Sequence, residues 1–318
     1  MLSKKRVLIA LLFVFVLMVS GCDVYKNMKT YTIKQGKDFI KYYTFKNEAE
    51  NKENLLIYID GSGYSSVLGR KEKGRWQTVT IAYELQNRLL SKFDLLVPEK
   101  RNMKPGKNYE HDIDILKDYT LDQRVQTAKT AITDYLADNP YQRVLLVGHS
   151  EGGCLLPRLY LSLKENFTIS GLALLSAGGL SQYEMFRILK DKDLPMPAEY
   201  KVRVSRIEEA AKDIKENPDS ITKGYLGHPY KRWSSFMFYR PIDDLAQINI
   251  PILMIHGSED IMAPVESSRL VKEEFESLGK SNLCYIEYAG KGHDLGGDFD
   301  RVVNDIENWF EEIIHKAD

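Results

Sequence analysis

Apolar runs alternate along most of the chain with segments whose apolar residues recur at helical spacing. The central runs lack polar alternation, which is typical of strands that are buried on both faces. The runs are NLLIYID (54–60), FDLLVPE (93–99), RVLLVG (143–148), ISGLALLSA (169–177), IPILMIHG (250–257) and NLCYIEYAG (282–290). Helical spacing occurs at 76–92, 120–140, 152–164, 264–279 and 300–316. This alternation predicts an α/β fold with a mostly parallel central sheet flanked by helices on both faces.

The pattern changes in two places. Near the N-terminus, KTYTIK (29–34) and FIKYYTFK (39–46) alternate and are rich in aromatic residues, which predicts half-exposed antiparallel strands. Between residues 180 and 240 the alternation stops, and an insert of this length within a compact domain is usually functional. We therefore divide the chain after its leader into N-terminal residues 22–52, a core of residues 53–179 and 241–318, and a cap of residues 180–240.

Local signals refine two of the predicted helices. Thr120 and Gln123 have the spacing of a capping box at the start of the helix at 120–140, and Pro140 marks its end. Pro157 lies inside the predicted helix at 152–164 and should perturb it, because proline lacks the backbone N–H that the helix needs.

The first residues have the layout of a signal peptide. MLSKKR (1–6) is basic, and the apolar run at 7–20 is short for a membrane-spanning helix. VSGC (19–22) resembles the lipobox of bacterial lipoproteins, in which the cysteine is lipidated and becomes the first residue after cleavage. The alternatives are an ordinary signal peptide and an uncleaved anchor. The resemblance implies that residues 1–21 are removed and that lipidated Cys22 holds the protein at the extracytoplasmic face of the cell membrane.

Composition excludes some classes of partner. The 318 residues carry a net charge of −1, so no strongly basic field exists to attract a nucleic acid. Of the three cysteines, Cys154 and Cys284 have the setting of small buried hydrophobic residues. The spacing of Cys and His residues does not indicate zinc, and no metal or organic cofactor is expected.

The strand at 143–148 ends in the sequence Gly148-His149-Ser150-Glu151-Gly152, and a helical run follows. This G-x-S-x-G arrangement between strand and helix is typical of a nucleophile elbow, a turn so tight that its serine adopts a strained backbone and both flanking positions need glycine. The start of the helix also places free N–H groups near the serine, where an oxyanion would form. Ser150 is therefore the candidate nucleophile.

A serine nucleophile needs a base, and four histidines follow Ser150. His315 lies in a charged terminal segment, His228 lies in the insert, and His256 ends a strand, where packing or capping explains it better. His293, in the glycine-rich loop AGKGHDL after the last strand, is the best candidate base.

The acid of such a site follows the penultimate strand, where IHGSED presents Glu259 and Asp260. Asp260 has the better spacing to the strand and to Pro264, and Glu259 is the alternative. The loop after the strand at 54–60, DGSG, is the candidate source of a second oxyanion donor. We expect the backbone N–H of Ser62 to act there together with that of Glu151, although a plain turn is an equally good interpretation of the loop.

Four motifs in this order, DGSG, GHSEGG, PIDDLAQINIPILMIHGSEDIMAP and GKGHDL, resemble the α/β-hydrolase superfamily and within it the esterase, serine aminopeptidase and acylglycerol lipase-like group. The resemblance covers about residues 53–317. It implies a triad of Ser150, Asp260 and His293, and a lid formed by the insert. Many relatives have histidine and glycine where this chain has Asp60 and Gly61. An aspartate aimed at the oxyanion would oppose catalysis. Either Asp60 turns away, with loop backbone as its expected partner, or the oxyanion geometry differs from the one expected here.

Three functions fit these residues. The first is a serine hydrolase that cleaves carboxylic esters of small or medium acyl groups, with a small-molecule acyl substrate as its partner. The second is a serine aminopeptidase, which needs a cap carboxylate to bind the substrate amine; the candidates are Glu184, Glu199, Glu208, Glu209 and Glu216. The third is a non-catalytic binding lipoprotein on the same fold.

Two features of the insert bear on this choice. Glu208 and Glu209 stand among charged neighbours, which favours a solvated helix face for both. The aromatic residues of the insert could either join cap helices to the core or line an acyl pocket. These residues are Tyr183, Phe186, Tyr200, Tyr225, Tyr230, Trp233, Phe236, Phe238 and Tyr239.

Overall fold

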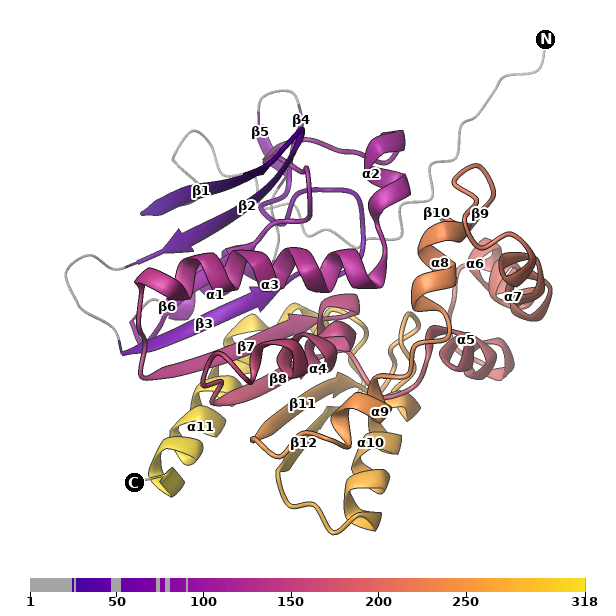
Figure 1. Cartoon of the computed structure of the whole chain (residues 1–318). Helices are drawn as coiled ribbons and strands as arrows, with labels where there is room; N and C mark the ends of the chain where they lie inside the picture. Colours follow the sequence, from indigo (N-terminus) through magenta and orange to yellow (C-terminus); the bar gives the residue numbers. More distant parts are fainter. Residues whose placement is uncertain are drawn as a thin grey trace.

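A twisted sheet forms the centre of the protein (Figure 1). The computed structural model describes residues 25, 27–46, 53–72, 75–77, 81–89 and 91–317. Within these residues the main sheet has eight strands, which run in spatial order as β1 (Met28–Gln35), β2 (Asp38–Phe45), β6 (Asp94–Pro98), β3 (Asn54–Ile59), β7 (Arg143–His149), β8 (Gly171–Leu175), β11 (Ile252–Gly257) and β12 (Leu283–Tyr288). Strands β1 and β2 pair antiparallel, as do β2 and β6, and every other pairing is parallel. The predicted mostly parallel sheet is confirmed.

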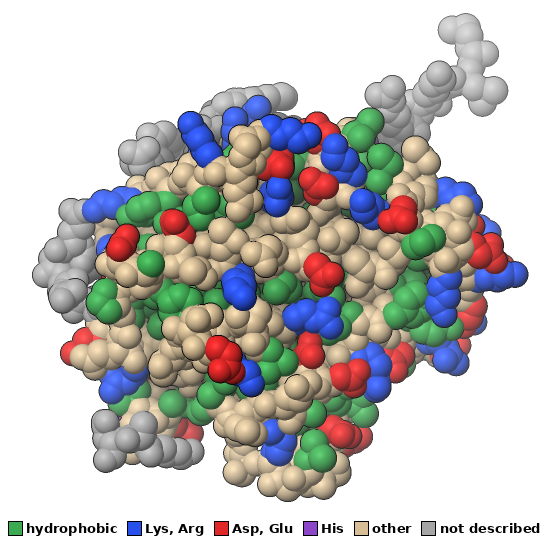
Figure 2. Space-filling model, in the orientation of Figure 1, with side chains coloured by type: hydrophobic (Ala, Val, Ile, Leu, Met, Phe, Trp, Pro, Cys, Tyr) green, Lys and Arg blue, Asp and Glu red, His purple; other side chains and the backbone are tan. Residues whose placement is uncertain are grey.

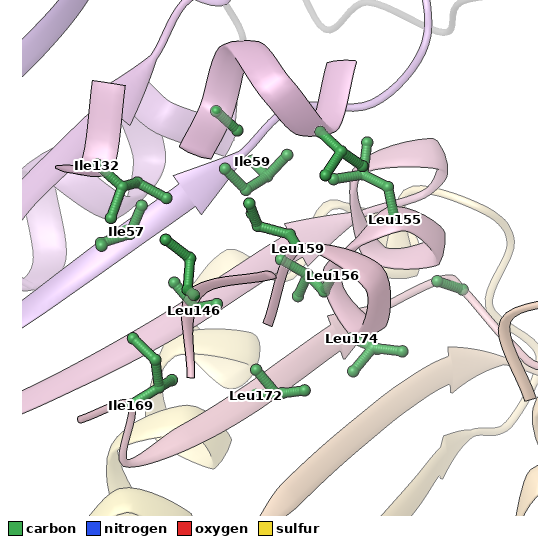
Figure 3. Close-up of a cluster of buried hydrophobic side chains, with 14 of the residues drawn as sticks. Ile57, Ile59, Ile132, Leu146, Leu155, Leu156, Leu159, Ile169, Leu172 and Leu174 are labelled. Atoms are coloured by element: carbon green, nitrogen blue, oxygen red, sulfur yellow. The ribbon is translucent and has the colours of Figure 1, made fainter. Parts of the chain in front are cut away.

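Helices cover both faces of this sheet. Alternate residues of β7 belong to different buried clusters: Val144 and Leu146 to one, Leu145 and Val147 to the other. The first cluster includes residues of α3 (Leu121–Asp138), α4 (Glu151–Leu163), α9 (Pro241–Leu245) and α10 (Glu266–Ser277), and Figure 3 shows its side chains between β7, β8 and the helices. The second includes residues of α1 (Ile81–Leu89) and α11 (Phe299–Ala317). The predicted helices on both faces are therefore confirmed, and the parallel strands are buried on both sides because each face has its own helix layer.

The insert forms a separate layer. Its elements are α5 (Gln182–Asp191), α6 (Ala198–Val204), α7 (Ile207–Glu216), the short ribbon of β9 (Gly224–Tyr225) and β10 (His228–Pro229), and α8 (Tyr230–Phe236). A buried cluster of its own, including Leu189, Val204, Ile207 and Trp233, holds these helices together. Figure 1 shows the insert beyond the carboxyl ends of β7 and β8, the edge at which reactive groups of such sheets lie. The boundaries at residues 180 and 240 stay a prediction.

Several local predictions are wrong in detail. The helix predicted from residue 76 begins at Ile81, and Arg75–Gln77 forms strand β5, paired with β4 (Arg70–Glu72). The sequence pattern also missed α2 (Ile113–Asp118), whose N-terminus is capped by the Asp112 carboxylate.

The N-terminal hairpin is half-exposed only in part. Strand β1 is mostly exposed, but β2 is mostly buried, because its side chains enter the buried clusters on both faces of the sheet. Ile40 and Tyr42 belong to the first cluster, and Tyr43 and Phe45 to the second. The capping box at α3 is likewise half formed: Thr120 accepts from the Gln123 N–H at 3.3 Å, while the Gln123 side chain donates to Thr127 instead. Pro157 lies inside α4, which continues to Leu163.

The surface charges and the cysteines can now be compared with the expectations from composition. Figure 2 shows acidic and basic side chains interspersed over one face of the molecule rather than gathered in a single basic field. Cys154 and Cys284, which were expected to be buried, are only partly buried; Cys154 packs against the first buried cluster and Cys284 against the second. Within the described part of the chain, no helix has the length and apolar character needed to cross a membrane, and no group of His, Cys, Asp or Glu side chains is arranged for a metal ion.

Candidate active site

Ser150 occupies a strained turn between β7 and α4. Its backbone has φ 56° and ψ −124°, which lies outside the regions that residues other than glycine usually adopt. The Ser150 N–H donates to the carbonyl of Leu175 at 2.9 Å. A Cβ on Gly148 would lie 2.6 Å from the carbonyl oxygen of Gly152, and a Cβ on Gly152 would lie 2.6 Å from that of Asp60. The turn therefore requires glycine at both positions, as the elbow motif predicts.

Gly152→Ala is expected to destabilise the protein by about 3 kcal/mol or more, because the new methyl group meets rigid backbone rather than a movable side chain. Thermal unfolding measures this effect. Gly292→Ala is the matched control, since a Cβ there has open space apart from an atom of Asp294 at 4.0 Å. Equal unfolding temperatures of the two variants would contradict the packing argument.

The structure brings Ser150, His293 and Asp260 together from three separate loops. The Nε2 atom of His293 lies 2.9 Å from Ser150 Oγ, and its Nδ1 atom lies 2.7 Å from Asp260 Oδ2. Asp260 follows β11 and His293 follows β12, so the carboxyl ends of neighbouring parallel strands deliver both groups to the elbow. Glu259, the alternative acid, is exposed and stands apart from this chain of hydrogen bonds.

Asp260 is buried and held in one orientation. Its Oδ1 atom accepts hydrogen bonds from the backbone N–H groups of Met262 and Ala263 at 2.8 and 2.9 Å. Burial by itself would raise the pKa of Asp260, but the charge of His293 and the hydrogen bonds from His256 and His293 outweigh it and hold the pKa well below its usual range. The carboxylate is thus ionised and oriented towards His293.

Burial opposes protonation of His293, but the Asp260 carboxylate and its hydrogen bond outweigh burial and raise the pKa above 6.5. Two further histidines surround this pair. His256 is fully buried, and its Nε2 atom lies 2.8 Å from the Ala263 carbonyl and 3.2 Å from Asp260 Oδ2. The expected packing role is therefore correct, but one of the groups that His256 contacts is the Asp260 carboxylate. His149 Nε2 lies 3.0 Å from the His293 carbonyl, and burial, together with the charge of His293, lowers the pKa of His149 to about 4.

The loop after β3 lies against the elbow. A Cβ on Gly61 would lie 3.4 Å from Ser150 Cβ, so this loop passes directly beside the serine and Ser62 follows the point of approach. The Asp60 carboxylate binds two side chains rather than loop backbone: Lys100 Nζ at 2.6 Å and Tyr58 Oη at 3.3 Å. Lys100 in turn donates to the Ser65 carbonyl. The charge of the Asp60 carboxylate is therefore balanced by a nearly buried ammonium group.

Sequence reasoning missed a buried charged cluster behind the elbow. The Glu151 carboxylate accepts hydrogen bonds from Arg124 of α3 and Tyr119, each at 2.8 Å, and from Arg232 of α8. Burial would raise the pKa of Glu151, yet the charges of Arg232 and Arg124 lower it to about 2. Two guanidinium groups face one carboxylate, so the cluster of Arg124, Glu151 and Arg232 carries a net positive charge.

The carboxylates of the insert point elsewhere. Glu208 and Glu209 are exposed and pair with Lys190 and Arg206, so their interpretation as a solvated helix face is confirmed. Glu184 closes a capping box with Ser181 at the start of α5, and Glu199 and Glu216 are exposed.

Most aromatic residues of the insert pack together or on the core. Phe186, Tyr200, Tyr230 and Trp233 join the buried cluster of the insert, Phe236 joins that of the core, and Phe238 is partly exposed.

His228, one of the rejected bases, contacts Tyr64 Oη at 2.9 Å and not Ser150. His315 is exposed on α11. Cys22 and the predicted signal peptide lie outside the described residues.

Known proteins share a segment of the sequence and the fold. A segment of 53 residues, 17% of the chain, is 38% identical to the esterase LipC of Mycobacterium tuberculosis, of whose length it spans only 13%. The fold resembles that of Est1E from Butyrivibrio proteoclasticus, with a TM-score of 0.57 and 16% identity over 90% of this chain and 99% of that one. It also resembles the proline iminopeptidase of Mycobacterium smegmatis, with a TM-score of 0.61 and 13% identity over 91% and 100% of the two chains.

Residues 119–300, more than half of the chain, match the model of the serine aminopeptidase S33 family. This match spans the elbow, the insert and the segments that carry Asp260 and His293. The protein belongs to this family and is a serine hydrolase of the α/β-hydrolase superfamily.

Proposed function

We propose that the protein cleaves carboxylic esters of small or medium acyl groups, with Ser150 as nucleophile, His293 as base and Asp260 as the group that orients His293. Ser150 attacks the acyl carbonyl while His293 Nε2 takes its proton. The backbone N–H groups of Ser62 and Glu151 stabilise the oxyanion, and His293 then protonates the departing alcohol. Water, deprotonated by His293, releases the acyl group and restores Ser150.

The net positive charge of the Arg124, Glu151 and Arg232 cluster favours an ester over an aminoacyl substrate. An aminopeptidase must bind the ammonium group of its substrate, which calls for a spare carboxylate near the serine. The one acidic side chain next to Ser150 in sequence is neutralised by two arginines, and the candidate carboxylates of the insert are exposed or cap a helix. Membership of the family is compatible with cleavage of either an ester or an aminoacyl amide bond, and it weighs against a non-catalytic binding protein.

The choice of bond is tested by comparing kcat/KM for a short-chain aryl ester and for an alanyl aryl amide on one preparation. We expect a higher value for the ester, because an alkoxide or phenoxide leaves more readily than an amine, which must be protonated as it departs. Glu208→Gln and Glu209→Gln should leave both values unchanged. A higher kcat/KM for the amide, lost in Glu208→Gln or Glu209→Gln, would show that the protein is an aminopeptidase.

We further propose that Cys22 is lipidated and tethers the enzyme to the extracytoplasmic face of the cell membrane. The basic, apolar and small-residue order of residues 1–22 supports this proposal. Cys22→Ala should block incorporation of a labelled fatty acid and arrest maturation of the precursor. Cys154→Ala is the control and should leave labelling intact; equal labelling of the Cys22→Ala variant would disprove the tether.

A further inference from the structure

A single buried network joins the insert to both segments proposed to form the oxyanion hole. Arg124 Nη2 donates to the carbonyl of Asp60 at 2.6 Å and its Nη1 to that of Gly61 at 3.3 Å, which fixes the loop that carries Ser62. The same Nη1 donates to Glu151, the first residue of α4. Arg124 therefore ties the loop after β3 to the elbow.

The insert closes this network through Arg232 on α8. The Arg232 side chain is 2% exposed and donates from Nη2 to Glu151 and from Nη1 to Gln182 Oε1, the latter at 2.8 Å. Its guanidinium carbon also lies 4.2 Å from the ring centre of Trp233 and 4.5 Å from that of Phe236. These contacts hold the Arg232 side chain in one buried orientation, and they form only when α8 is docked on the core.

Two features distinguish this network from ordinary packing. Arg124 by itself balances the charge of Glu151 and binds its Oε1 atom, so Arg232, which binds Oε2, adds a second buried positive charge behind the elbow. In addition, Arg232 Nε is buried without a hydrogen-bond partner among the described residues, which makes Arg232 expensive as a purely structural residue. His228, beside Arg232, adds no charge, because burial and the charge of Arg232 lower its pKa to about 3.

We propose that Arg232 is a positioning residue of the insert: acting through Glu151 and Arg124, it holds the backbone N–H groups of Ser62 and Glu151 in place, so that the oxyanion hole is complete only when the insert is docked. The inference rests on the proposed function, because it concerns the donors of that same site. Arg232 itself is too deeply buried to touch the substrate. Its effect therefore falls on kcat rather than on substrate binding.

The test compares Arg232→Gln and Arg232→Lys with Arg240→Gln, an arginine of the same insert segment whose ion pairs are partly exposed. Arg232→Gln should lower kcat for the aryl ester by about 100-fold with a much smaller change in KM. Arg232→Lys should fall between, because an ammonium group lacks the fork that reaches Glu151 and Gln182 together. Arg240→Gln should match the native protein.

Hydrogen exchange supplies a measurement that does not need turnover. Amides of residues 60–64 and 150–152 should exchange faster in Arg232→Gln, while those of α10 should not change. The inference would be overturned if Arg232→Gln showed both unaltered exchange in these segments and the kcat of the native protein. If Arg232→Gln does not fold, a native kcat in Arg232→Lys would overturn it instead. Failure of the proposed function would appear differently, as absence of ester turnover in the native protein.

Discussion

Ser150→Ala is expected to abolish labelling by a fluorophosphonate probe and to lower kcat for an ester by about 10⁶-fold. The reason is that Ser150 Oγ is the only atom of the hydrogen-bonded Ser150–His293–Asp260 chain that can form the acyl-enzyme. The rate that remains should come from substrate binding and the oxyanion donors alone. Gel-based labelling and steady-state kinetics of the purified variant measure the two effects.

Ser162→Ala is the matched control for this experiment. Ser162 lies on the same helix, α4, and its hydroxyl donates to the Leu159 carbonyl far from His293. The control should label and turn over as the native protein does. Persistent labelling of Ser150→Ala would assign the nucleophile to another residue and remove the basis of the proposed mechanism.

Asp260→Asn should lower kcat by about 10⁴-fold while leaving the fold intact. Asparagine is nearly isosteric, but its amide cannot both accept the proton on His293 Nδ1 and balance the imidazolium charge. The wrong tautomer of His293 then presents a proton, not a lone pair, to Ser150. Glu259→Gln is the control, because Glu259 is exposed and adjacent in sequence. A loss in Glu259→Gln with native activity in Asp260→Asn would exchange the two roles.

The pH profile gives an independent check of the same pair. His293 accepts the serine proton only when neutral, so kcat/KM should fall as the pH drops through the His293 pKa, which Asp260 raises above 6.5. Asp260→Asn removes the main cause of that increase, and only the smaller effect of the Asp294 charge then opposes burial. The acid limb of its residual activity should therefore move to lower pH, and an unmoved limb would mean that another group titrates.

Local pattern was sufficient for the fold and for the triad candidates. Uninterrupted apolar runs and helical spacing predicted the parallel sheet, because strands buried on both faces need apolar side chains on both. The elbow was predictable because a strained turn imposes glycine two positions on either side of Ser150. The choices of His293 over the other histidines and of Asp260 over Glu259 followed from their places after successive strands, and the structure brings those residues, not the alternatives, into contact with each other.

Only the tertiary structure placed the charges around the site. Arg124 and Arg232 stand 27 and 81 residues from Glu151, on helical segments whose local pattern contains no sign of a buried ion pair. In the same way the charged partner of Asp60 proved to be Lys100, 40 residues away, and His256 proved to contact Asp260. Hydrophobic periodicity records which face of a segment is buried, whereas the partner of a buried charge depends on how distant segments cross, and the sequence determines that crossing only through the packing of the whole chain.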